Sequence, residues 1–166
     1  MIKAGNTPPR HFREPLRAAH QIRRLVFTGF RKCCYPLQKF DSMEGEWRLA
    51  QVLEDDPTVQ RWMKPAPGQF RIEYRGGHAY EPDFVVETDT EKLLIEPKRE
   101  SEMDDEEVRL KARAAVRWCR HASDHARQHG GKPWHYLLVP HTAIRSQSSV
   151  VGLRGQYTVP PGRDAP

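Results

Sequence analysis

The sequence predicts an α/β fold in which helices flank a central mixed β-sheet. Three observations predict it: an amphipathic segment near residues 42–54, short stretches of strand character between residues 70 and 95, and a long segment of helical periodicity that begins near residue 104 and is followed by an apolar run at 134–139. We expect these elements in the order helix, hairpin, strand, helix, strand.

The length of the chain limits the number of domains. Its 166 residues suit one domain and not two. We expect a basic, proline-containing linker or stub at 1–25, a single domain at 26–145 and a disordered tail at 146–166. Prolines without an apolar period mark the first part, and a rise in Ser, Gly and Pro marks the last.

The composition predicts a soluble protein, with 37% hydrophobic and 30% charged residues. No apolar stretch approaches the roughly 18 residues that span a bilayer. The N-terminus lacks the apolar core of a secretory signal, so we expect a cytoplasmic protein. The three cysteines have no framework spacing and are expected to be reduced thiols.

Basic charge is concentrated in the N-terminal quarter of the chain. Residues 1–39 contain nine Lys and Arg residues and a single acid, Glu14, whereas the rest contains 18 basic and 21 acidic residues. Clustered Lys and Arg residues neutralise phosphates. This basic charge is compatible with a polyanionic partner such as a nucleic-acid backbone, but it does not require one.

The first helix is predicted from a start signal and a stop signal. Asp41, followed three residues later by Glu44, forms a capping-box pattern. Leu49 and Leu53 then recur at helical spacing, and the Asp-Asp-Pro sequence at 55–57 ends the pattern. We expect a helix over about 42–54 and a short turn after it.

A hairpin and a buried strand follow. Phe70, Ile72 and Tyr74 alternate with polar residues, and Gly76-Gly77 favours a tight reversal, so the returning strand is expected at 80–86. The apolar run at 93–95 is typical of a strand buried on both faces.

The last two predicted elements are a long helix and a strand. Four acids at 104–107 precede a segment rich in alanine at helical spacing, and acids favour a helix N-terminus. Gly130-Gly131 ends this helix. The run at 134–139 is then expected to form another buried strand.

Two carboxylates and an amine lie where two neighbouring strands meet. Asp83 opens one predicted strand and Glu96 closes the next, so a hairpin would place them side by side. Mg²⁺ prefers carboxylate oxygens and water, and it activates water for phosphodiester hydrolysis. Lys98 lies two residues beyond Glu96 and so shares its face of the strand, where an ammonium could offset charge on a phosphate.

The pattern Pro-Asp at 82–83, then Glu-x-Lys at 96–98, preceded by a helical Glu, resembles the PD-(D/E)xK restriction-endonuclease-like superfamily. Over roughly residues 26–144, the sequence resembles more closely the C-terminal nuclease region of type III restriction enzyme Res subunits. The segments that carry this second resemblance are 40–42, 64–70, 80–86, 96–98, 111–119 and 130–134.

The resemblance implies a restriction-endonuclease-like fold and a Mg²⁺-dependent endonuclease that hydrolyses DNA. It further implies that Asp83 and Glu96 hold the metal and that Lys98 acts on the attacking water. Glu46 would be the auxiliary acid of the helix. Glu44 competes for that last role, because the offset between helix and sheet is not fixed by the sequence.

The chain also departs from a complete Res subunit. It contains no G-x-x-x-x-G-K-[ST] phosphate loop, so it has no ATPase motor of its own. The resemblance therefore implies a separate nuclease part, or a remnant, of a type III restriction system. Its expected partners are double-stranded DNA and the helicase or translocase and methyltransferase subunits of such a complex. The alternative is a catalytically inactive module of the same fold that binds nucleic acid or docks to a helicase.

Overall fold

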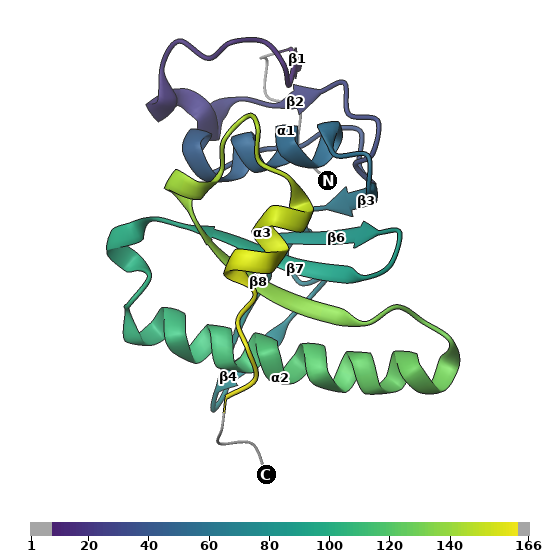
Figure 1. Cartoon of the computed structure of the whole chain (residues 1–166). Coiled ribbons are helices and arrows are strands. Elements are labelled where there is room, and N and C mark those ends of the chain that lie inside the picture. Colours follow the sequence, from purple (N-terminus) through teal and green to yellow (C-terminus); the bar gives the residue numbers. More distant parts are fainter. Residues whose placement is uncertain (1–7, 163–166) are drawn as a thin grey trace.

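A computed structural model of the chain describes residues 8–162 (Figure 1). It has a four-stranded mixed sheet between helical layers, which confirms the predicted α/β class. The strands, in spatial order, are β3 (Val59–Met63), β6 (Phe84–Thr88), β7 (Lys92–Lys98) and β8 (Trp134–Pro140). Strands β3, β6 and β7 are antiparallel neighbours, and β8 runs parallel to β7.

The long helix α2 (Glu106–His129) covers one face of the sheet (Figure 1). Its alanines allow a close approach, and Ala112, Ala115 and Cys119 pack with Leu94 and Tyr136 of the sheet. Gly130 ends the helix at φ 72°, a left-handed conformation that glycine adopts without steric cost. The predicted long helix and its glycine stop are confirmed.

The first helix covers the other face. It begins as a π-helix, η2 (Met43–Trp47), and continues as α1 (Arg48–Asp55), whose Leu49 and Leu53 are fully buried. The predicted Asp41–Glu44 capping box is wrong. The Ser42 hydroxyl instead accepts the Glu46 N–H (3.0 Å), and the Glu46 carboxylate accepts the Asp41 N–H (2.7 Å), because the wider π-turn moves the reciprocal bonds along the chain.

The returning arm of the predicted hairpin is split in two. β4 (Ile72–Arg75) pairs with β5 (His78–Tyr80) in a separate small sheet beside α2, while β6 belongs to the main sheet. Pro82 lies between β5 and β6 and has no N–H for a ladder, which accounts for the break. The segment after Pro57, expected as a turn, forms the edge strand β3.

The expected N-terminal linker is part of the fold over its described residues. β1 (Arg10–His11) pairs with β2 (Phe27–Thr28), and η1 (Ala19–Arg24) follows β1 along the chain. Phe12 and Ile22 are buried in the core on the α1 side of the sheet. Isolated apolar residues gave no periodic signal, although they bury a large area. Residues 1–7 lie outside the described part.

The expected disordered tail is likewise largely folded. After η4 (His141–Ala143), the chain forms α3 (Val150–Tyr157), and Val150 and Leu153 are buried. The Asp56 carboxylate accepts the Val150 N–H at 2.7 Å and so anchors the start of α3. Its eight residues show almost no amphipathic pattern, so the helix does not stand out in the sequence. Residues 163–166 lie outside the described part.

Candidate functional site

Asp83 and Glu96 meet at one end of the central hairpin. Phe84 pairs with Ile95 across β6 and β7, and the next step of this register sets Asp83 opposite Glu96. Directly opposed residues of an antiparallel pair project from the same face. Val85 and Leu94, which share that face, pack in the core against α2. The two acids therefore lie on the α2 side of the sheet.

Glu96 is a buried carboxylate with one unsatisfied oxygen. The residue is 6% exposed. The Tyr136 hydroxyl donates to its Oε2 at 3.0 Å, whereas Oε1 is buried and has no hydrogen-bond partner. Leaving a buried acceptor unpaired costs about 1–3 kcal/mol, and more for a charged group. The site thus carries an unsatisfied lone pair beside a second acid.

Burial and neighbouring negative charges raise the pKa of both carboxyls. Burial raises the pKa of Glu96 well above its usual range, and the charge of Asp83 raises it further. Burial likewise raises the pKa of Asp83, opposed by the attraction of Lys64. Removal of two carboxylates from water disfavours their charged forms, and each charge disfavours the other. The pair is energetically costly unless a cation joins it.

Lys98 provides positive charge at the same site. It is half-buried at the end of β7, two residues beyond Glu96, and strand alternation places the two side chains on one face. Burial raises the pKa of both Asp83 and Glu96, and the charge of Lys98 lowers both by a smaller amount. The structure thus brings together the three residues expected to act at the end of the hairpin.

Glu46 lies nearby but is engaged elsewhere. Its carboxylate is buried and forms an ion pair with Lys64 at 2.9 Å, in addition to the bond from the Asp41 N–H. Its charge still acts on Asp83. The competing acid, Glu44, is exposed and lines a neighbouring pocket. Of the two helical acids, Glu46 is therefore the one whose charge raises the pKa of Asp83.

Sequence reasoning missed Lys64, Tyr80 and Tyr136 at this site. Burial and the charge of Glu96 raise the pKa of the Tyr80 hydroxyl, so Tyr80 also lies near that carboxylate. Lys64 follows β3, lies 4.8 Å above the Phe84 ring centre and is the strongest attractive charge on Asp83. It was missed because β3 itself was expected as a turn. In the sequence, Tyr136 cannot be told apart from other aromatic residues of a buried strand. Its place beside Glu96 follows only from the register, which pairs Tyr136 with Leu94.

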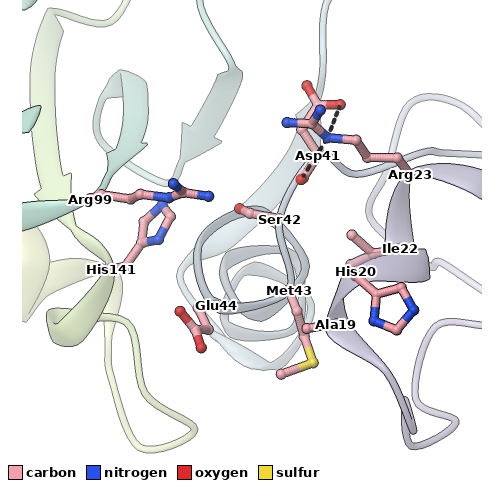
Figure 2. Close-up of a pocket in the computed structure, with 10 residues that line it drawn as sticks. All are labelled: Ala19, His20, Ile22, Arg23, Asp41, Ser42, Met43, Glu44, Arg99 and His141. Carbon is pink, nitrogen blue, oxygen red and sulfur yellow. Dashed lines mark hydrogen bonds and ion pairs between the residues drawn. The ribbon is translucent and has the colours of Figure 1, made fainter.

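A half-open pocket of about 420 Å³ lies at the start of η2 (Figure 2). Met43 and Glu44 line it from the same helical turn that supplies Glu46. Arg99, which directly follows Lys98, lines it from the end of β7. None of Asp83, Glu96 and Lys98 is among the residues that line this pocket.

The donor set fits a magnesium ion better than a transition metal. Within residues 8–162, no group of three or more His, Cys, Asp or Glu side chains is arranged to hold a metal. Magnesium, however, usually binds through one or two carboxylates and keeps several waters. Asp83 and Glu96, with the unpaired Oε1, provide two such carboxylates.

Comparisons with protein-family models, curated proteins and solved structures give no significant match to this chain. Among the described residues, no helix has the length and apolar character required to cross a membrane.

Proposed function

We propose that this chain is a magnesium-dependent endonuclease of the PD-(D/E)xK type that hydrolyses phosphodiester bonds of DNA. One observation carries the proposal: Glu96 is buried beside Asp83 with Oε1 unpaired, although this arrangement is costly for a folded protein. Costly pairs of titratable groups are concentrated at functional sites. A divalent cation would balance both charges and satisfy the unpaired oxygen.

Each residue then has a distinct role. Asp83 and Glu96 would hold Mg²⁺, which, when bound, polarises a phosphate oxygen and lowers the pKa of water. Tyr136 donates to Oε2 of Glu96, which would leave Oε1 as the oxygen able to bind the ion. The Lys98 ammonium orients the attacking water and offsets the negative charge that builds on the phosphate.

Glu46 acts as a positioning residue in this scheme. Its carboxylate binds both Lys64 and the backbone before the helix, so it fixes Lys64 relative to Asp83. Lys64 in turn limits the repulsion that Asp83 experiences within the site. The helical acid of the resemblance thus supports the metal ligands through a lysine.

At the level of the whole protein, we propose a restriction-endonuclease-like fold and a cytoplasmic role within a type III restriction system. The resemblance of residues 26–144 to Res nuclease regions supports this, as does the mixed sheet with the acids at the end of its central hairpin. Because the chain lacks a phosphate loop, translocation and sequence recognition would come from helicase and methyltransferase subunits.

A plasmid assay tests the proposal. The purified chain with Mg²⁺ should nick or linearise supercoiled DNA, and EDTA should stop it. Asp83→Asn and Lys98→Ala should each lower the rate at least 100-fold without changing the circular dichroism spectrum. Glu44→Gln, on the exposed neighbouring acid, is the matched control and should retain activity. Cleavage that survives in Asp83→Asn, purified in parallel, would disprove the mechanism.

One observation favours the alternative function, a non-catalytic module that binds nucleic acid or docks to a helicase. The Glu46 carboxylate is already paired with Lys64, which removes it from the set of free acids. In that case the wild-type chain would bind DNA with the same affinity in Mg²⁺ and in EDTA, and no strand would be cut under either condition.

A further inference from the structure

A groove of about 150 Å³ lies on the same face of the sheet as Asp83 and Glu96. Its floor is formed by Met63, Val85 and Trp134, of which Val85 and Trp134 pack with the core on the α2 side. Val85 lies two residues beyond Asp83, so strand alternation points both side chains to one face. This β6 groove therefore continues along the strand from the acid pair.

A row of charged side chains crosses the sheet at the β6 groove. The register sets Arg61 opposite Glu87 and Glu87 opposite Lys92, so all three project from one face. Glu87 is the acid of the lining, and it is paired with Arg61 at 2.7 Å and with Lys132 at 3.0 Å. Three cations and one carboxylate leave the row with a net charge of +2.

Lys92 is the cation of this row that has no carboxylate partner within residues 8–162. Its ammonium lies 5.3 Å from the centre of the Trp134 ring, and an edge-on contact with Trp118, at 4.9 Å between ring centres, holds that ring in place. Cations beside aromatic rings are typical of grooves that bind a strand of nucleic acid. Arg61 adds planar N–H donors that match a phosphate, and its side chain is 64% exposed.

We propose that the β6 groove binds one strand of the DNA substrate, with its phosphates on Arg61 and Lys92 and a base against the floor at Trp134. The inference rests on the proposed nuclease function and gives the strand a path to the acid pair. A β-strand rises about 3.4 Å per residue, so the charged row lies about 14 Å from Asp83 along β6. At about 3.4 Å per nucleotide of a duplex strand, the bound phosphates lie about four nucleotides from the bond that is cut.

The thiol of Cys34 reports on the occupancy of the groove without cleavage. Cys34 is exposed and lines the groove, and its N–H donates to the Trp62 carbonyl of β3 at 2.9 Å. Burial raises the pKa of Cys33 to about 11 and that of Cys119 to about 12, so Cys34 reacts first with N-ethylmaleimide at pH 7.5. A saturating short DNA duplex, in EDTA, should slow this reaction at least fivefold, as measured by mass spectrometry. An unchanged rate would overturn the inference.

Charge variants test the row itself. Lys92→Gln and Arg61→Gln should each weaken binding of the duplex at least threefold, because each removes a phosphate contact. Arg113→Gln, at an exposed cation of α2 outside the groove, is the matched control and should bind as the wild type does. Circular dichroism checks that each variant is folded. Equal affinity in the wild type and in both groove variants would overturn the inference.

Two further arms separate the groove from the proposed function. Poly-L-glutamate at the same charge concentration should protect Cys34 less than DNA does, because it has no flat ring for the apolar floor. Equal protection would make the groove a general polyanion site and overturn the assignment. Asp83→Asn should keep the protection by DNA although it cannot cut. Cleavage by the wild type without protection of Cys34 would overturn the groove and leave the nuclease function standing, whereas protection without cleavage would support the groove and contradict the function.

Discussion

Glu96 occupies a position that a carboxylate normally avoids. It is 6% exposed, shares its surroundings with Asp83 and has one oxygen without a hydrogen bond. A raised pKa in the folded state means that stability from this residue is fully present below the unfolded pKa and is lost as the pH rises through the folded pKa. The metal-free protein therefore loses stability toward alkaline pH at this residue.

Replacement of Glu96 by Gln should stabilise the metal-free protein. A neutral amide removes the repulsion from Asp83 and can still accept the Tyr136 hydroxyl. We expect the free energy of unfolding in EDTA at pH 8 to rise by about 1–3 kcal/mol, and to change little near pH 4, where the wild-type carboxyl is protonated. Urea denaturation at the two pH values measures both.

Glu87→Gln is the matched control on β6. Partial burial raises the pKa of Glu87, but the hydrogen bond from Lys132 and the charge of Arg61 outweigh this effect and hold the pKa below its usual value. Its stabilising effect is present at neutral pH and lost as the pH falls, so Glu87→Gln should lower stability at pH 8. A Glu96→Gln variant that is also less stable at pH 8 would contradict our account of the acid pair.

At the scale of elements, α3 shows how a short segment without a sequence signal becomes part of the core. Leu153 is buried against the α1 side of the sheet, and Asp56 anchors the first N–H of the helix. Leu153→Ala should destabilise the protein by about 2–4 kcal/mol because it leaves a cavity. Val151→Ala, at a residue 67% exposed in the same helix, should stay within about 0.5 kcal/mol. Thermal unfolding measures the stability of both variants. An equal loss of stability in Leu153→Ala and Val151→Ala would mean that α3 does not pack on the sheet in solution.

Elements with a long period or a continuous apolar run were predictable from the sequence. α2, β7 and β8 lie where the pattern put them, and the β6–β7 hairpin brings Asp83 and Glu96 together as expected. β3, η1 and α3 were missed because short elements owe their structure to tertiary burial of one or two residues, which no local period reveals.

The same limit applied to the site. Asp83, Glu96 and Lys98 follow from strand alternation and hairpin pairing, which are local rules. Tyr136 contacts Glu96 because β8 pairs with β7, although α2 separates these strands along the chain. Lys64, just after the edge strand β3, acts on Asp83 through its charge. Contacts between elements so distant in the chain depend on the whole sheet, so the local pattern could not identify them.

At the scale of the whole molecule, residues 8–39 of the basic N-terminal quarter are folded against the domain, and Arg17 and Arg24 are exposed there. The double variant Arg17→Gln and Arg24→Gln should weaken DNA binding, because each phosphate contact releases counterions. We expect the slope of log affinity against log salt to fall by about 1.8, which corresponds to two contacts. Fluorescence anisotropy in EDTA, with a short duplex at several salt concentrations, measures it.

Arg113→Gln with Arg117→Gln is the charge-matched control on the outer face of α2. It should leave the salt slope unchanged if DNA runs along the N-terminal segment toward the acid pair. The reverse pattern, a lower slope in the α2 variant alone, would place the DNA on the opposite side of the molecule and separate it from η1.

The central claim is that Asp83 and Glu96 share one divalent cation. Calorimetric titration of Mn²⁺, as a tighter-binding substitute for Mg²⁺, into the metal-free protein at pH 7.5 tests it most directly. We expect one saturable site in the wild type and in Glu44→Gln, with affinity at least tenfold lower in both Asp83→Asn and Glu96→Gln. Equal Mn²⁺ affinity in the wild type and in these two variants, or no saturable binding to the wild type, would contradict the claim.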